Sequence, residues 1–381
     1  MRLLLLLVFA VTSLPLAAQL ITRNFLFNSY NRIYDLELPT SYAPGDRLPL
    51  VLDLHYLGQD GRGQDTLTDF FLVADTANFI ICHPWGQSTN WNVGFNAPYA
   101  SGDRDVGFIS AVIDSIDAEF GVDRQRIYVT GMGQGGFMAH RLACELSGKI
   151  AAMAAVGASI TDSAAFYCAP IRPVPVMLIH GTADSVIPYA GNPGFWPGVD
   201  ALVDFWLDKN GCPNSVRTTT AYPNTVVADN STVNRHHYAC NSASEVVLYE
   251  VVNGGFTWPG HNCNLLNGGV VNLDLPSSVE IWNFFRQWSL SGPVNTPAPA
   301  APLGLQIGPN PVHEGLYLRF DRLPKGGYAR LIDLSGKEIY AEEIAAGNQE
   351  LRVDLANVPA GMYLLRLEAG AQFTARRIVR Q

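Results

Sequence analysis

The stretch "IYVTGMGQGGF", Ile127 to Phe137, decides the fold. A run rich in β-branched and aromatic residues leads into a cluster of glycines, and the helix-forming segment "GGFMAHRLACEL" follows at once. This order predicts a strand, a tight turn and a helix. Turns of this kind with the pattern G-x-S-x-G expose a nucleophilic serine. Here the pattern reads "GMGQG", so Gly133 occupies the serine position.

Glycine at position 133 is compatible with the turn itself. Such a turn holds its central residue at positive φ, which costs an ordinary residue on the order of 1–3 kcal/mol. Glycine adopts these angles freely. We therefore expect a turn that keeps its shape and lacks the nucleophilic hydroxyl.

Outward from this turn, short buried strands alternate with amphipathic helices over residues 19–290. The strands include "LPLVLDLHY", "FIICHP", "IAAMAAVGA", "VPVMLIHGTAD" and "EVVLYEVVNG", and the helices include "VGFISAVIDSIDAEFG", "VDALVDFWLDKNG" and "SSVEIWNFFRQW". The alternation predicts an α/β domain with a mostly parallel sheet covered by helices on both faces. Ligands of such sheets bind at the carboxyl ends of the strands.

The C-terminal part of the chain has a different pattern. The segment "SGPVNTPAPAAP", Ser291 to Pro302, is rich in proline and alanine and predicts an extended linker. Residues 303–381 alternate apolar and polar residues between turn signals, which predicts a small antiparallel β-sandwich. The expected organisation is thus an α/β domain over 19–290, a linker over 291–302 and a sandwich over 303–381.

Composition narrows the range of functions. The 381-residue chain has a formal net charge of −9, which argues against nucleic acid or an anionic membrane surface as the main partner. Its first eighteen residues, one arginine followed by an apolar run and small residues, predict a secretory signal peptide cleaved after Ala18. No later segment is apolar for long enough to predict a membrane span.

The six cysteines lie at positions 82, 144, 168, 212, 240 and 263. In an exported chain an even number favours disulfides over buried free thiols. We expect at least two bridges, and we prefer Cys144–Cys168 and Cys212–Cys240 because each closes a short local loop. Six cysteines allow fifteen pairings, so the spacing alone leaves the others open.

Several motifs of residues 25–288 together resemble one family, the secreted polyhydroxybutyrate depolymerases and feruloyl esterases of the α/β-hydrolase fold. They occur in the family's order: "PLVLDLHYLGQDG", "DVGFISAVIDSI", "DRQRIYVTGMGQGGFMAHRLACEL", "PVPVMLIHGTADSVIPYAG", "DFWLDKNGC" and "NGGFTWPG". The resemblance implies a serine carboxylic-ester hydrolase whose nucleophile, acid and base follow one another along the chain.

The catalytic positions implied by the resemblance are only partly filled. Asp184 stands at the acid position, although a carboxylate there could also merely cap the loop. Gly133 replaces the nucleophile, and Phe256 stands where the family has its histidine base. The oxyanion loop reads His55-Tyr56 where the family has histidine-glycine, and Gln134 follows the elbow. Three departures at functional positions indicate that the hydrolytic machinery is lost.

Two further histidines could take the place of the missing base. His261 or His83 within hydrogen-bond reach of Asp184 would revive a working hydrolase, although a surface-loop histidine is the simpler interpretation of His261. Trp91, Trp258 and His261 are candidate ligand-binding residues, with loop packing as the alternative for each tryptophan. The pair "HH" at 236–237 has no cysteine or carboxylate at metal spacing, so we expect an exposed loop, no metal and no cofactor.

The C-terminal segment resembles the type A sorting domain of the type IX secretion system. The residues that carry the resemblance are "GPNPV", "LIDLSGKEIY", "VDLANVPAGMYLLRL" and the basic end "RRIVRQ". It implies that the type IX secretion machinery is a partner and that the protein is secreted or held at the cell surface. A carbohydrate-binding sandwich is the alternative, but the tyrosines of this segment are too scattered to form an aromatic face.

Together these patterns predict an exported α/β-hydrolase-fold protein that has lost catalysis and binds polyester or plant-polysaccharide esters. The alternative is an active carboxylic-ester hydrolase with rearranged machinery. Its test is geometric, because such an enzyme needs a histidine beside Asp184 and Gly133.

Overall fold

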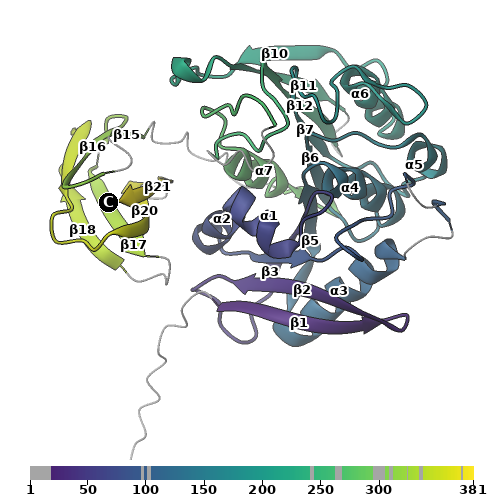
Figure 1. Cartoon of the computed structure of the whole chain (residues 1–381), viewed down its shortest axis with the longest axis horizontal. Helices are drawn as coiled ribbons and strands as arrows, with labels where there is room; N and C mark the ends of the chain where they lie inside the picture. The colour runs from purple at the N-terminus through teal and green to yellow at the C-terminus, as the bar shows by residue number, and fades with distance from the viewer. Residues whose placement is uncertain are drawn as a thin grey trace, which may run out of the picture. The chain divides into compact units, whose positions relative to one another are not determined.

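The computed structural model describes residues 19–95, 98–100, 104–240, 244–261, 268–294, 305–308, 312–323, 325–333, 338–369 and 372–381. The contacts between residues divide the chain into a large unit within Leu20–Thr296 and a small unit formed by the C-terminal residues (Figure 1). The predicted signal peptide, Cys263 and much of the proline-rich linker lie outside the described residues.

The large unit is built on one ten-stranded sheet with the strand order β1-β2-β4-β3-β5-β6-β7-β12-β11-β10. Its parallel centre consists of buried apolar strands, as the sequence pattern predicts. These strands are β3 (Leu48–Leu54), β4 (Ile80–Pro84), β5 (Val122–Gly131), β6 (Ala152–Val156), β7 (Val176–Gly181) and β12 (Glu245–Val252).

Both edges of the sheet are antiparallel extensions that the sequence pattern does not predict. One edge holds β1 (Gln19–Phe27) and β2 (Tyr30–Leu38), and the other holds β11 (Thr232–Ala239) and β10 (Arg217–Ala221). Every residue of β10 is exposed. This strand therefore lacks the apolar alternation by which a strand is recognised in the sequence. The pair His236–His237, expected in an exposed loop, lies instead on β11, where the His236 side chain is buried.

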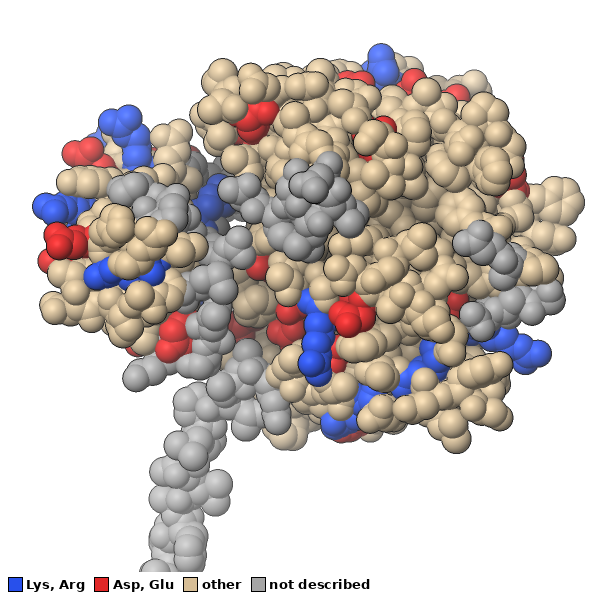
Figure 2. All heavy atoms as spheres, in the orientation of Figure 1, with Lys and Arg blue, Asp and Glu red and all other residues tan. Residues whose placement is uncertain are grey.

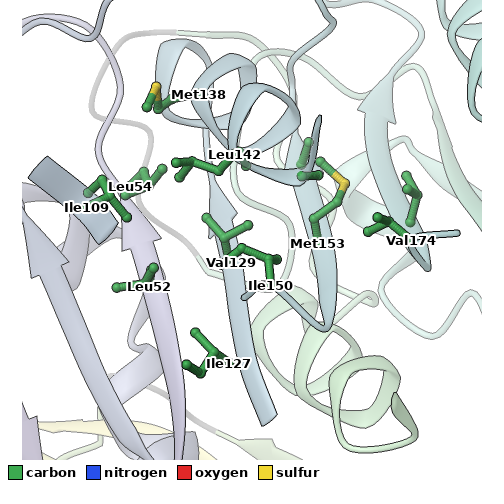
Figure 3. Close-up of a cluster of buried hydrophobic side chains, with 14 of the residues drawn as sticks. Leu52, Leu54, Ile109, Ile127, Val129, Met138, Leu142, Ile150, Met153 and Val174 are labelled. Carbon is green, nitrogen blue, oxygen red and sulfur yellow. The ribbon is translucent and has the colours of Figure 1, made fainter. Parts of the chain in front are cut away.

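Helices cover both faces of the sheet, and the alternation of residues along β3 shows how. Leu50, Leu52 and Leu54 belong to the core under α3, α4 and α6, whereas Val51 belongs to the core under α1, α2 and α7. Figure 3 shows the first core, with Leu142 of α4 facing Val129 of β5. The helices are α1 (Gly61–Thr68), α2 (Phe70–Ala77), α3 (Asp105–Phe120), α4 (Gln134–Glu145), α5 (Asp162–Tyr167), α6 (Val199–Lys209) and α7 (Ser277–Phe285).

Two disulfides, Cys144–Cys168 and Cys212–Cys240, fix loops of the large unit, so both preferred pairings are confirmed. The first joins the end of α4 to the end of α5. Cys82 is buried on β4 and carries a free thiol. No helix in the described part of the chain has both the length and the apolar character that a membrane span requires.

The small unit consists of antiparallel strands in two sheets, with the orders β15-β16-β19 and β18-β17-β20-β21. Side chains from both sheets form one core, so the predicted sandwich is confirmed. Its strands are β15 (Gln306–Gly308), β16 (Gly315–Arg319), β17 (Gly327–Asp333), β18 (Glu338–Ile344), β19 (Glu350–Asp354), β20 (Gly361–Ala369) and β21 (Gln372–Arg380).

Candidate active site

The turn between β5 and α4 has the geometry of a nucleophile elbow. Gly133 caps α4 with φ +52° and ψ −123°, a conformation that an ordinary side chain strains to adopt. Its backbone N–H donates to the carbonyl of Val156 on β6. Gly135 lets the turn approach β3, because a Cβ there would lie 2.0 Å from the carbonyl oxygen of Leu54. The elbow expected from the sequence is therefore present, without a hydroxyl at its tip.

The space in front of the elbow is filled by the Phe256 ring. A Cβ on Gly133 would lie 2.8 Å from Cζ of Phe256 and 3.3 Å from Cβ of Tyr56. The rings of Phe256 and Tyr56 meet edge to face with centroids 6.4 Å apart. Both side chains are buried, at 4% and 5% exposure. Position 133 thus carries no hydroxyl, and two aromatic rings fill the space in front of it.

Asp184 lies in the loop after β7, close to Gly157, which also adjoins the Phe256 ring. A Cβ placed on Gly157 would lie 3.0 Å from Phe256 and 3.4 Å from Oδ2 of Asp184, so the ring, the glycine and the acid adjoin one another. Oδ1 of Asp184 accepts hydrogen bonds from the backbone N–H groups of Val186 and Ile187. Oδ2 is buried and has no hydrogen-bond partner in the described part of the chain.

The electrostatics of Asp184 follow from this arrangement. Burial raises the pKa of its carboxyl to about 6, and the two backbone donors only partly offset that shift. In a Ser-His-Asp triad the free carboxylate oxygen would accept a proton from an imidazole. Here a phenyl ring, which neither donates nor accepts a proton, occupies the neighbouring space. No imidazole is hydrogen-bonded to Oδ2 of Asp184 in the described part of the chain.

No histidine of the described chain takes the place of Phe256. His261 lies 2.8 Å from a carboxylate oxygen of Asp69, and His83 lies between Asp53 and Asp65. His180, at the end of β7, comes within 3.5 Å of Asp184, but its Nε2 lies 2.8 Å from the carbonyl oxygen of Ile187. The geometric condition for a rearranged hydrolase is thus not met by His261 or His83.

The residues expected in the oxyanion loop have structural contacts. His55 is fully buried, with Nδ1 at 2.9 Å from the Tyr56 carbonyl oxygen, while Nε2 accepts the N–H of Gly86. The amide oxygen of Gln134 accepts the backbone N–H of Trp91. The side chains of His55 and Gln134 therefore brace the loops around the elbow, while the Tyr56 ring helps to close it.

Two predicted ligand-binding residues have packing roles instead. Trp91 and Trp258 are each 1% exposed, and their indole N–H groups donate to the carbonyl of His55 and to the hydroxyl of Ser278. His261 is buried beside Asp69. All three side chains are thus largely buried, and their role in ligand binding stays a prediction.

Two residues of this site escaped the sequence analysis. Gly157 leaves room for the Phe256 ring, because a Cβ there would lie 3.0 Å from it. The sequence feature that could have identified Gly157 is its place directly after the buried run "AAMAAV". His180 stands beside the acid, and its signal was the histidine of "LIHG". Both follow strands of the parallel sheet, where functional positions of such folds gather.

The strand order and the elbow together define an α/β-hydrolase fold. Comparisons with known proteins agree. Residues 102–194 match the phospholipase/carboxylesterase family model, and residues 306–381 match the secretion system C-terminal sorting domain. A bifunctional acetylxylan esterase/xylanase of Neocallimastix patriciarum is 27% identical over 68% of this chain, and feruloyl esterase B of Piromyces equi is 27% identical over 67%.

These matches cover only part of the relatives. The alignments span 33% of the Neocallimastix protein and 45% of the Piromyces protein. The acetyl xylan esterase structure from Aspergillus awamori aligns with 62% of this chain and 94% of its own, at a TM-score of 0.49 and 14% identity. The large unit is an esterase-like α/β-hydrolase with homologues among feruloyl and acetylxylan esterases, and the chain ends in a secretion sorting domain.

Proposed function

We propose that the protein is an exported, catalytically inactive relative of feruloyl and acetylxylan esterases that binds ester-bearing polymers. The single observation that supports the loss of catalysis is the Phe256 ring, which fills the space in front of Gly133 and adjoins Gly157, the glycine next to Asp184. A serine mechanism needs a hydroxyl, a base that takes its proton and a site for the reacting carbonyl next to both. Positions 133 and 256 supply none of these.

Export is supported by two parts of the chain. Residues 306–381 match the secretion system C-terminal sorting domain, and the first eighteen residues have the composition of a signal peptide. The type IX machinery is then the partner of the small unit, and the protein is released or displayed at the cell surface. The paired cysteines suit that oxidising destination.

The proposed polymer-binding surface consists of aromatic rings outside the closed site. Phe166 and Tyr167 at the end of α5 are 81% and 55% exposed, and Phe195 between β8 (Gly191–Asn192) and β9 (Trp196–Pro197) is 56% exposed. The carbonyl of Phe195 accepts the N–H of Asp162 at the start of α5, which links the two segments. Exposed rings stack on sugars and on aromatic acyl groups.

The surroundings of these aromatic segments suit an uncharged polymer. They follow β6 and β7, whose carboxyl ends lie at the same edge of the sheet as the elbow. The visible face of the large unit over α4 to α6 carries few charged side chains (Figure 2). Acetylated or feruloylated polysaccharides and polyesters fit such a surface better than a polyanion does.

Hydrolysis and binding assays test the two parts of the proposal separately. Wild-type protein should not hydrolyse p-nitrophenyl acetate or methyl ferulate above the enzyme-free rate. Turnover that disappears in Asp184→Ala would show a working enzyme and contradict the loss of catalysis.

Binding is tested by sedimentation with acetylated xylan, feruloylated arabinoxylan and polyhydroxybutyrate. Phe166→Ala and Phe195→Ala should each release the protein from the polymer that it binds. Tyr30→Ala is the matched control, because Tyr30 is an aromatic residue of similar exposure (57%) at the start of β2, far along the sheet order from α5. Equal binding by all four proteins would refute the aromatic surface.

A further inference from the structure

A second cluster of functional groups lies on the large unit, away from the elbow and outside the proposed function. Glu37 of β2, His83 of β4 and Asp65 of α1 each offer one nitrogen or oxygen atom, and these atoms all lie within 4.8 Å of one another. Glu37 pairs with Ile81, which lies two residues before His83 on β4. Because side chains two residues apart on a strand point to the same face, Glu37 and His83 share one face of the sheet. Helix α1 covers this face and brings Asp65 (Figure 1).

His83 is the observation that points to a ligand. Its side chain is completely buried, and neither ring nitrogen has a hydrogen-bond partner among the described residues. Nε2 lies 3.7 Å from Oδ1 of Asp65, which is also buried and unpartnered. A buried polar group without a partner costs about 1–3 kcal/mol, so Nε2 of His83 and Oδ1 of Asp65, two unsatisfied atoms that face each other, require an explanation.

The other side of the imidazole has the surroundings expected of a metal ligand. Nδ1 faces Asp53, with a carboxylate oxygen 3.7 Å away. Asp53 is itself held in place by the side chains of Gln64 and Thr68, which donate to its two oxygens. Metal-bound histidines usually direct their second nitrogen to a carboxylate or carbonyl that fixes the ring. Asp53 occupies that outer position.

From this geometry we infer that Glu37, Asp65 and His83 form a binding site for one divalent transition-metal ion of the Zn²⁺ type. Zn²⁺ accepts imidazole nitrogen and carboxylate oxygen at about 2.0–2.2 Å in a tetrahedral arrangement, which places ligand atoms about 3.4 Å apart. Nε2 of His83 and Oδ1 of Asp65, at 3.7 Å, are already near that spacing, and separations of up to 4.8 Å in the cluster would close by about 1.4 Å or less through side-chain rotation. The imidazole favours Zn²⁺ over Ca²⁺, Mg²⁺ and Mn²⁺, which prefer oxygen ligands.

Charge and access agree with a cation. Asp35 and Asp69 add negative potential around the cluster, and Arg62 approaches Asp35 rather than any of the three ligands. Asp65 retains 27% exposure, which leaves an entry from solvent. The bound ion would join β2, β4 and α1 and so fasten the N-terminal edge of the sheet. This proposed site differs from the sequence-based expectation of no metal. Its ligands come from three separate segments of the chain, so they form no spacing motif in the sequence.

The test uses the full, tag-free chain, first stripped of metal by a chelating resin. Titration calorimetry should show one Zn²⁺ per chain. Glu37→Gln and Asp65→Asn should each weaken Zn²⁺ binding at least about 10-fold, because loss of a residue that merely supports a ligand already costs that much. His237→Gln is the matched control, because it removes another histidine that pairs with a carboxylate, Glu245 at 2.6 Å. Its affinity should equal that of the wild type.

Two outcomes would overturn the site: a wild type that binds no Zn²⁺, or an Asp65→Asn variant that binds it as tightly as the wild type. Asp65 lies on a partly exposed helix, so this variant remains informative if Glu37→Gln fails to fold. Co²⁺ provides a second measurement. The wild type should develop visible d–d absorption with one equivalent of Co²⁺, and Asp65→Asn should lose it while His237→Gln keeps it.

Discussion

Gly133→Ser tests the closed site most directly, through stability. The added Cβ meets the Phe256 ring at 2.8 Å and Cβ of Tyr56 at 3.3 Å, so a buried ring has to move. Overpacking of this kind costs about 1–3 kcal/mol. The φ of +52° adds on the order of 1–3 kcal/mol for a residue other than glycine. Gly133→Ser should therefore lower the free energy of unfolding by about 2–6 kcal/mol.

The two contributions separate in a double-mutant cycle with Phe256→His. The smaller imidazole relieves the contact with the new side chain, while the backbone strain stays. The cost of Gly133→Ser should thus be about 1–3 kcal/mol smaller in the Phe256→His background, the size of coupling expected for residues in contact. Urea unfolding of the four proteins measures this difference. An equal cost in both backgrounds would refute the idea that Phe256 fills the space of the nucleophile.

The same four proteins report on activity. Gly133→Ser alone should not hydrolyse a short acyl ester, because its hydroxyl has no base beside it. Gly133→Ser with Phe256→His restores a nucleophile and a base next to Asp184, so the gain should be strongly non-additive. Tyr56→Gly should raise the rate further by opening the oxyanion loop. High activity from Gly133→Ser alone would instead point to His180 as the base.

Three further results are expected. Deletion of residues 303–381 should leave a folded large unit that stays in the periplasm, and its appearance outside in normal amounts would contradict the sorting role. Alkylation of the unfolded mature protein should label at most two cysteines before reduction and six after it, whereas six before reduction would exclude disulfides. Burial raises the pKa of Asp184 from 3.8 to about 6, so the folded state holds this proton more tightly than the unfolded state. The free energy of unfolding should therefore decrease as the pH rises from about 4 to about 6. Asp184→Asn should gain on the order of 2–3 kcal/mol over the wild type across that range, and a pH-independent difference would contradict it.

The parts of the fold that the sequence predicts are those with a strong local signal. Uninterrupted apolar runs identify β3 to β7, because a parallel strand is buried on both faces. The glycines around position 133 identify the elbow, because only that residue type permits its close contacts with β3. The disulfide pairs could be chosen because each bridge is local in sequence.

The parts that the sequence does not predict depend on contacts between distant segments. The burial of Trp91 and Trp258 depends on contacts with other parts of the chain, so an aromatic motif alone does not show whether the rings are exposed. The packing of Phe256 against Gly133 depends on Gly157, a distant glycine that adjoins the same ring, and the sequence does not show that contact. The cluster of Glu37, Asp65 and His83 has no spacing motif, because its members meet only through the sheet register and the position of α1.

The bridge Cys144–Cys168 makes the stability of α4, the helix that follows the elbow, depend on whether the compartment is oxidising or reducing. It closes a loop with a sequence separation of 24, and Cys212–Cys240 closes one of 28. Closing loops of this length restricts the unfolded chain by about 3 kcal/mol each. In a reducing compartment the chain would lack both constraints and would unfold more readily than in an oxidising one. Under the proposed export, the large unit would therefore reach its full stability only after it leaves the cytosol.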